Sequence, residues 1–270
     1  MKTKLAKPVG VAVNGAAGRM GCTLVRFISE DPSLKLVGAL EAPGHPRLGQ
    51  DAGVVAGVGA LGVLVATELS VNADVVIDFS LPEGTVRCAK LCAQSGMAMV
   101  AGTTGLDDAQ LAKLRETARA VPVVFAPNMS VGVNLLMRLV GDVAKALGDA
   151  YDIEIVEMHH RFKKDAPSGT ALGLAQAIAK ATGRDLKSDG VFGRAGAVGA
   201  RKSREIGIHA VRGGDVVGDH TVTFATLGER VELSHKAGSR DTFARGALRA
   251  ARFVVGRKPG LYSMADVLGL

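Results

Sequence analysis

The sequence contains no tryptophan, and aromatic residues account for only 4% of its 270 residues. Proteins that bind single-stranded nucleic acid stack bases on aromatic side chains, so this scarcity argues against that class of function. The formal net charge of +7 still indicates anionic partners. Because the lysines and arginines are scattered along the chain, a phosphorylated cofactor with an acidic substrate explains the charge equally well. We therefore expect no nucleic acid partner.

Cysteine and long apolar runs are also scarce. The three cysteines, Cys22, Cys88 and Cys92, cannot form a complete set of disulfides. No segment approaches the roughly 20 apolar residues of a membrane span. The basic N-terminus resembles the start of a signal peptide, but the apolar run at 9–13 is too short and leads into a glycine-rich turn. These absences predict a cytoplasmic, soluble protein without a membrane partner.

Residues 9–41 have the order of a dinucleotide-binding unit. An apolar strand at 9–13 leads into the glycine turn GAAGRMG at 15–21, then a helical pattern, then a strand at 36–40 that ends in Glu41. Such glycines let the backbone approach a pyrophosphate at a helix N-terminus, and the acid accepts a hydrogen bond from a ribose 2′-OH. The spacing is G-x-x-G-x-x-G rather than G-x-G-x-x-G, so a purely structural turn is the alternative.

The alternation of strands and helices continues to residue 125. Strands are expected at 73–80, 97–101 and 121–125, with helices at 82–95 and 107–120, which predicts a Rossmann-type, doubly wound parallel sheet. Ligands of such sheets lie at the carboxyl ends of the strands. Phe79 and Ser80 share this edge with the predicted cofactor-binding residues, which are Gly15, Ala16, Ala17, Gly18, Arg19, Met20, Glu41, Gly102, Thr103, Thr104, Ala126, Pro127, Asn128 and Met129.

The pattern changes after a helix at 133–147. Strands at 152–158, 206–212, 216–225 and 230–236, with one helix near 171–182, predict an α+β domain on a mixed sheet. We interpret 211–217 as a hairpin turn and 188–203 as a mobile loop whose Arg194, Arg201 and Lys202 are solvated. A closing helix at 242–255 packs on the first domain. The predicted domains are therefore 1–130 with 241–270 for the dinucleotide, and 131–240 for substrate binding and oligomerisation.

The segment at 157–170, EMHHRFKKDAPSGT, gathers protonatable nitrogens beside a predicted helix N-terminus, which favours anions. Each part also has an ordinary interpretation: a surface histidine pair, a solvated lysine pair and Ser168 as an N-cap. A metal site is a further alternative. Adjacent histidines on a strand point to opposite faces, however, and no further ligand completes a set. We expect no metal.

Six segments of the chain form a recognisable set: 15–21, 78–84 (DFSLPEG), 102–105 (GTTG), 128–134 (NMSVGVN), 159–170 and 212–220 (RGGDVVGDH). Together they resemble the 4-hydroxy-tetrahydrodipicolinate reductase (dihydrodipicolinate reductase) family. The resemblance extends from about residue 9 to residue 270. It implies NAD(P)H-dependent reduction of a cyclic dicarboxylate, 4-hydroxy-tetrahydrodipicolinate, to tetrahydrodipicolinate with loss of water, in lysine and diaminopimelate biosynthesis. It also implies a homotetramer assembled through the second domain's sheet.

The resemblance assigns roles within 159–170. A hydride added to an imine must be accompanied by a proton, and an imidazole titrates near the operating pH, so His159 is expected to be the general acid. Lys163 resembles a second proton donor and could instead hold a carboxylate. His160 resembles a substrate-binding residue, whereas Lys164 is expected to be solvated. A substrate carboxylate would be bound by Ser168, Gly169 and Thr170.

One departure from the family concerns the coenzyme. Members that use NADPH well often carry an arginine directly after the acid of the second strand, where this chain has Ala42 and Pro43. A carboxylate favours a ribose 2′-OH over a 2′-phosphate, so NADH is expected to be used at least as well as NADPH. Arg19 and Arg47 are the cations that could offset the repulsion.

Two other functions fit parts of the sequence. Homoserine dehydrogenase-like reductases also insert a sheet into a nicotinamide-binding domain, but they are not expected to share the segment at 159–170. A redox sensor that binds NADH and then DNA would need a helix-turn-helix or a concentrated basic face, and the sequence predicts neither.

Overall fold

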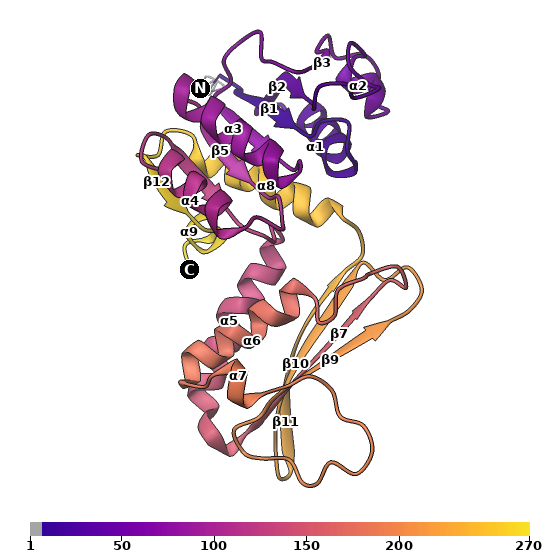
Figure 1. The fold of residues 1–270 in the computed structure, drawn as a ribbon, viewed down its shortest axis with the longest axis vertical. Coiled ribbons are helices and arrows are strands. Elements are labelled where there is room, and N and C mark those ends of the chain that lie inside the picture. Colours follow the sequence, from indigo (N-terminus) through magenta and orange to yellow (C-terminus); the bar gives the residue numbers. More distant parts are fainter. Residues whose placement is uncertain (1–6) are drawn as a thin grey trace, which may run out of the picture. The chain divides into compact units, whose positions relative to one another are not determined.

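The computed structural model describes residues 7–270 (Figure 1). The chain divides into two units, the first formed by the residues up to Val131 together with Asp241–Gly269, and the second by Gly132–Arg240 with Leu270. The second unit is thus inserted between two segments of the first. Each unit has its own buried apolar core.

The first unit contains a parallel sheet of seven strands within the described residues, in the order β12-β6-β5-β4-β1-β2-β3. This confirms the predicted doubly wound fold. The strand order reverses between β1 and β4, which is where such sheets bind ligands. The strands are β1 (Val9–Asn14), β2 (Leu34–Leu40), β3 (Val65–Ala66), β4 (Val75–Asp78), β5 (Ala98–Ala101), β6 (Pro122–Phe125) and β12 (Gly260–Tyr262).

Helices cover both faces of this sheet, so its strands alternate between two cores. In β1, Val11 and Val13 belong to one core and Ala12 to the other. Because both faces are buried, the strands are apolar without alternation, which is why they could be recognised in the sequence. One face carries α1 (Arg19–Glu30), α2 (Ala52–Val55), α8 (Asp241–Val254) and α9 (Met264–Leu268), and the other carries α3 (Pro82–Ser95) and α4 (Asp108–Thr117).

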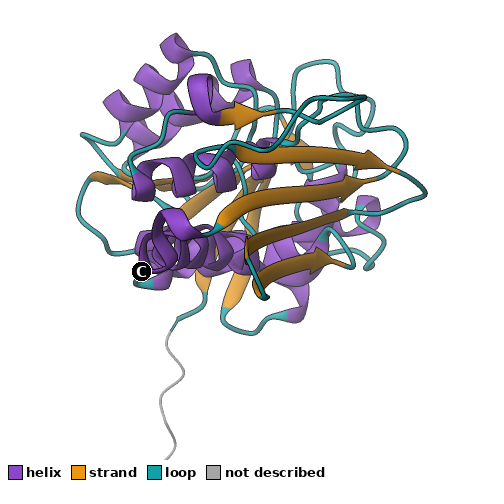
Figure 2. Cartoon of the chain, turned by 90° about the horizontal axis from the view of Figure 1, so that it is seen from below, coloured by secondary structure: helices purple, strands orange, loops and turns teal. Residues whose placement is uncertain are grey.

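The second unit contains a mixed sheet in the order β11-β10-β7-β9-β8, as predicted. Helices cover one face of it (Figures 1 and 2). Alternate residues of β7, such as Ile153 and Ile155, pack under them. The elements are α5 (Val131–Leu147), η1 (Gly148–Ala150), β7 (Asp152–His159), α6 (Gly169–Thr182), α7 (Leu186–Asp189), β8 (Gly190–Val191), β9 (Ile206–Arg212), β10 (Gly218–Thr226) and β11 (Glu229–Ala237).

The predicted hairpin at 211–217 is wrong. β9 and β10 are not neighbours, because β7 lies between them and pairs with both. The turn instead crosses the end of β7, where the N–H of Gly213 donates to the carbonyl of His159 and the N–H of Arg161 donates to the carbonyl of Gly214. A Gly-Gly-Asp sequence indicates a chain reversal but does not specify which strand lies beside it.

The segment at 188–203 is not the mobile loop with solvated arginines that the sequence predicted. It contains the end of α7 and the short strand β8. Arg194 forms ion pairs with Glu154 and Glu205, and Arg201 forms ion pairs with Asp152 and Glu154. These two arginines therefore fasten the segment to the sheet, which the sequence interpretation as solvated residues missed.

Candidate functional site

The glycine turn after β1 needs glycine for steric reasons. Gly15 has a φ of +78°, and a Cβ there would lie 2.6 Å from the carbonyl oxygen of Phe79. A Cβ on Gly21 would lie 2.1 Å from the carbonyl oxygen of Gly15. Glycine at both positions lets α1 begin close to the ends of β1 and β4.

The N-terminus of α1 is open to an anion. Gly18 is the N-cap, and no side chain of the described residues caps this end. The first N–H groups of a helix have no partner within the helix and favour a phosphate. Beside them, the backbone N–H of Ala17 donates to Oε1 of Glu41 at 2.9 Å, so the acid after β2 reaches the glycine turn.

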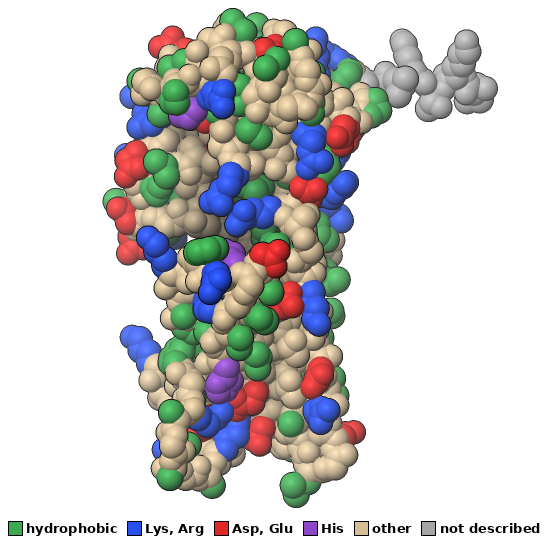
Figure 3. All heavy atoms as spheres, turned by 90° about the vertical axis from the view of Figure 1, so that its right-hand side faces the viewer, with side chains coloured by type: hydrophobic (Ala, Val, Ile, Leu, Met, Phe, Trp, Pro, Cys, Tyr) green, Lys and Arg blue, Asp and Glu red, His purple; other side chains and the backbone are tan. Residues whose placement is uncertain are grey.

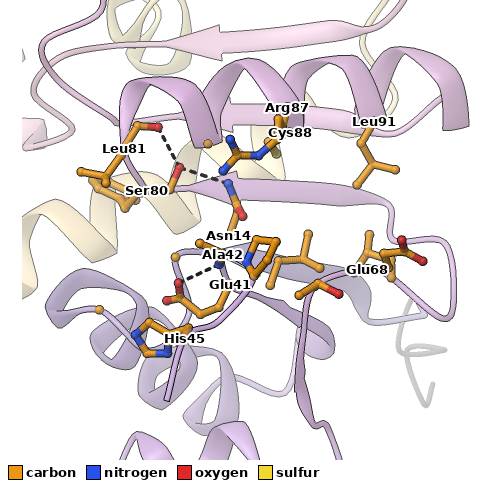
Figure 4. A pocket seen from close by; sticks show the side chains of 18 residues that line it. Asn14, Glu41, Ala42, His45, Glu68, Ser80, Leu81, Arg87, Cys88 and Leu91 are labelled. Carbon is orange, nitrogen blue, oxygen red and sulfur yellow. Dashed lines mark hydrogen bonds between the residues drawn. The ribbon is translucent and has the colours of Figure 1, made fainter. Parts of the chain in front are cut away.

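A cavity of about 760 Å³ adjoins this turn (Figure 4). Three of the predicted cofactor residues, Gly15, Gly18 and Glu41, line it. Sequence reasoning missed much of the rest, because these side chains come from the end of β1, from loops and from α3 without a motif. The missed lining residues include Asn14, His45, Thr67, Glu68, Arg87 and Leu91.

A buried carboxylate joins the strand ends beside the cavity. Asp78 is fully buried and accepts hydrogen bonds from four side chains. They come from the ends of β1, β4 and β5 and from α3, so Asp78 fixes the edge of the sheet against the start of that helix. Its donors are Asn14, Ser80, Thr85 and Thr103.

The remaining predicted cofactor residues do not line this cavity. Gly102 and Thr104 follow β5, and the segment at 126–129 follows β6, where Met129 is buried. Arg19 is exposed at the start of α1. Arg47 donates to Gln50 and is also absent from the lining. Ala16, Ala17 and Met20 belong to the turn or to the first turn of α1 without facing the cavity.

The second unit holds a separate cluster of ionisable groups centred on Glu157. The side chain of Glu157 is fully buried on the helix-covered face of β7. It accepts from both terminal nitrogens of Arg212 at 2.8 Å, from the backbone N–H of Ser168 at 3.0 Å and from Nδ1 of His159 at 2.5 Å. Burial opposes its ionisation, but these donors outweigh that effect and lower the pKa of Glu157.

His159 lies between this carboxylate and a second histidine. Its side chain is 11% exposed, and its ring makes an edge contact with the ring of His220 at 5.1 Å between centroids. Burial, followed by the charge on His159, lowers the pKa of His220 to about 4. His220 is therefore neutral near pH 7. Its Nε2 lies 3.2 Å from the hydroxyl of Ser168, which also accepts from the N–H of Ala171 as the N-cap of α6.

The other candidate residues follow β7. Nζ of Lys163 is within 2.9 Å of both carboxylate oxygens of Asp165, and the lysine side chain is 20% exposed. The ring of His160 lies 6.4 Å from that of Phe162. Gly169 and Thr170 form the first turn of α6, whereas Lys164 is exposed. The structure thus brings most of the segment around one end of β7.

The described residues offer neither a metal-binding cluster nor a helix that could span a membrane. Among residues 7–270, no group of three or more histidine, cysteine, aspartate or glutamate side chains is placed to hold a metal ion. No helix in this range is long and apolar enough to span a membrane. On the face drawn in Figure 3, basic side chains are interspersed with acidic ones.

Comparison with known proteins decides the family. The sequence model for dihydrodipicolinate reductase, N-terminus, matches residues 9–129, and that for the C-terminus matches residues 132–268. The chain belongs to the dihydrodipicolinate reductase family. It is 56% identical to 4-hydroxy-tetrahydrodipicolinate reductase of Thiobacillus denitrificans over 97% of this chain and 99% of that protein. It is 54% identical to the enzyme of the same name from Anaeromyxobacter sp. over 97% of this chain and 98% of that protein.

A solved structure supports the same conclusion. Dipicolinate-bound dihydrodipicolinate reductase from Paenisporosarcina sp. TG-14 superposes with a TM-score of 0.74 at 25% identity, covering 96% of this chain and 98% of that one. Dihydrodipicolinate reductases are NAD(P)H-dependent oxidoreductases of lysine and diaminopimelate biosynthesis, and this membership confirms the family resemblance seen in the sequence.

Proposed function

We propose that this chain reduces 4-hydroxy-tetrahydrodipicolinate to tetrahydrodipicolinate, with loss of water, using NADH or NADPH. The observation that carries the proposal is the cluster at the end of β7. There a buried ion pair between Glu157 and Arg212 holds His159 beside the N-terminus of α6, and Lys163 follows in the loop after the strand. Such a cluster suits a substrate that carries two carboxylates and must receive a proton. The names of the relatives identify that substrate.

The first unit fits a dinucleotide. Gly15 leaves the space that a Cβ would fill, the N-terminus of α1 is open to a pyrophosphate, and Glu41 stands at the second strand's end for a ribose hydroxyl. A nicotinamide cofactor bound there supplies the hydride. We assign the pyrophosphate to residues 15–20 and further contacts to Gly102–Thr104 and Ala126–Met129, which follow β5 and β6.

In the second unit, His159 delivers the proton. Lys163 binds a substrate carboxylate or serves as a second donor, and His160 contacts the ring. The backbone N–H and hydroxyl of Ser168 already bond Glu157, Ala171 and His220. We therefore assign the second carboxylate mainly to Gly169 and Thr170, which begin the helix, with Ser168 holding them in place.

NADH is the coenzyme that the cavity favours. Two carboxylates, Glu41 and Glu68, line it, and a 2′-phosphate near either would be repelled. Arg87 lines it from α3 (Figure 4). We expect kcat/KM with NADH to equal or exceed that with NADPH, and a tenfold preference for NADPH would contradict the assignment. Ala42→Arg places a cation directly after Glu41, as in family members that use NADPH well. It should raise kcat/KM for NADPH about tenfold.

We further propose that the second unit assembles the chain into a homotetramer through its sheet. Val156 and Val211 are each 42% exposed on the face of β7 and β9 opposite the helices, an arrangement that favours burial against another copy. Light scattering coupled to size exclusion tests this proposal. Val156→Glu should reduce the measured mass, whereas an unchanged tetramer would place the interface elsewhere.

The activity itself requires a coupled assay. 4-Hydroxy-tetrahydrodipicolinate synthase generates the substrate, and oxidation of NADH or NADPH is followed at 340 nm, where reduced nicotinamide absorbs. Oxidation should begin only when the synthase and its substrates are all present. If the purified chain oxidises neither coenzyme under these conditions, the proposed reaction is wrong.

A further inference from the structure

The carboxylate of Glu157 acts only as an acceptor. Its pKa is lowered, so it is ionised near pH 7, and its two oxygens accept from Arg212, Ser168 and His159. The atom of His159 that faces it is Nδ1, at 2.5 Å. An ionised carboxylate has no proton to give, so Nδ1 of His159 must carry one.

This contact determines which nitrogen of His159 serves the reaction. With Nδ1 bound to Glu157, the neutral ring has its lone pair on Nε2, and the protonated ring offers the Nε2 proton. A Cβ placed on Gly218 would lie 3.0 Å from Nε2. The glycine therefore leaves the Nε2 edge of the ring uncrowded. Carboxylates that orient a catalytic histidine in this way strongly affect turnover in other enzymes.

Arg212 opposes the effect of Glu157 on the charge of His159. Its guanidinium binds both carboxylate oxygens at 2.8 Å and also donates to the carbonyl of Asp165 at 2.7 Å. It thus ties β9 to the loop that carries Lys163. A negative charge beside the ring stabilises the imidazolium, and a positive charge behind that carboxylate weakens this stabilisation.

Ionisable groups lie around His159 on four strands of the sheet and in the loop after β7. His220 is neutral, as described above, and its own neighbour across the sheet is His235. Lys163 is paired with Asp165. The titratable and charged groups near His159 are therefore Glu157 on β7, Arg212 on β9, His220 on β10, His235 on β11, and Lys163 and Asp165 in the connecting loop.

We propose that Glu157 and Arg212 are positioning residues that hold His159 as the Nδ1–H tautomer, with Nε2 as the proton-donating atom, and set in opposite directions the pH range over which it donates. The kinetic part of this inference rests on the proposed function. The tautomer is a property of the folded chain and can be measured without turnover.

The first experiment compares pH–rate profiles of the full-length chain and its variants. Glu157→Gln should lower kcat about 10- to 100-fold. It should also move the basic limb of the profile to lower pH, because the protonated ring loses its anion. Arg212→Met should move that limb to higher pH, because the anion remains and its counter-cation is gone. Circular dichroism and thermal melting establish that each variant is folded.

Glu154→Gln is the matched control. Glu154 lies on the same strand and also binds arginine and histidine side chains, but on the opposite face. Its substitution should leave kcat and the profile unchanged. If Glu157→Gln lowers kcat without moving the basic limb, or if Arg212→Met moves the limb in the same direction, the pair has only a structural role and the proposal fails.

The second experiment records ¹⁵N spectra of the histidine side chains in the wild-type chain, with His159→Gln to assign the signal. The neutral ring of His159 should carry its proton on Nδ1. A proton on Nε2 would overturn the inference even if the chain is an active reductase. Conversely, a chain that lacks activity in the coupled assay but shows the Nδ1–H ring would contradict the proposed function alone.

Discussion

Strand β7 carries two glutamates that each bind arginine bidentately and contact a histidine, one on each face of the sheet. Glu157 is fully buried and binds Arg212 and Nδ1 of His159. Glu154 is 26% exposed and binds Arg194, Arg201 and Nε2 of His209. The same residue types therefore form an inner cluster around Glu157 and an outer cluster around Glu154.

The difference between the clusters lies in burial and in the nitrogen that is bound. The outer cluster joins the segment at 192–205 to the sheet. Its ion pairs are partly exposed and share several charged partners, so solvent and neighbouring charges weaken each single attraction. The inner cluster has one arginine for one carboxylate, and its contact with Nδ1 leaves Nε2 of His159 as the nitrogen for the proposed proton donation. Sequence composition alone would not distinguish the two, whereas their positions on the strand do.

The largest expected effect is a loss of kcat on substitution of His159 in the inner cluster that does not occur on substitution of His209 in the outer cluster. His159→Gln should lower kcat about 10²- to 10⁴-fold, because a positioned general acid contributes that much. Coenzyme binding, measured by fluorescence titration with NADH, should be retained, because the proposed nucleotide site lies in the first unit. His209→Gln is the control and should keep near wild-type turnover. Equal losses in the two variants would remove the functional distinction between the clusters.

A smaller effect is expected from the glycines that face each cluster. A Cβ on Gly218 would lie 3.0 Å from Nε2 of His159, and one on Gly207 would lie 1.8 Å from Oε2 of Glu154. Gly218→Ala must displace a ring that Glu157 holds, so kcat should fall about tenfold, in line with the sensitivity of catalysis to small displacements. Gly207→Ala displaces the end of a flexible side chain, which should lower the melting temperature and spare kcat.

Steady-state kinetics and thermal melting on both glycine variants provide the measurement. The comparison would fail if Gly207→Ala reduced kcat as much as Gly218→Ala does, since the outer cluster would then influence turnover. It would also fail if Gly218→Ala left kcat unchanged, because the edge of the ring near Nε2 would then tolerate crowding.

The sequence predicted the sheets better than the contacts between distant segments. Residues 9–13 and 121–125 could be recognised as strands because both their faces are buried, so every residue is apolar. The short β12 and α9 were missed because segments of three to five residues carry no measurable periodicity. The hairpin prediction failed because a turn sequence does not reveal that another strand lies between its two arms.

The same limit applies to the candidate site. The residues of 157–170 could be proposed together because they are contiguous. Glu157 and Arg212 are 55 residues apart, and their pairing depends on β7 and β9 lying side by side with both side chains on the covered face. The strand period places Glu154 and Glu157 on opposite faces, but which of these faces is buried depends on the covering helices α5 and α6.

The smallest expected effect tests the stabilising role of the outer cluster. Burial opposes the ionisation of Glu154, but hydrogen bonds from Arg194, Arg201 and His209 outweigh it and lower the pKa of Glu154 to about 2. A carboxyl whose pKa is lowered by folding contributes stability above its unfolded pKa, and that contribution is lost as the pH falls towards the folded value.

Glu154→Gln should thus cost about 1 kcal/mol of unfolding free energy at pH 7 after allowance for solvent screening. In urea titrations the gap between wild type and variant should narrow from about pH 5 downward and close near pH 2. A gap that is constant with pH would mean that packing, and not charge, connects the outer cluster to the sheet.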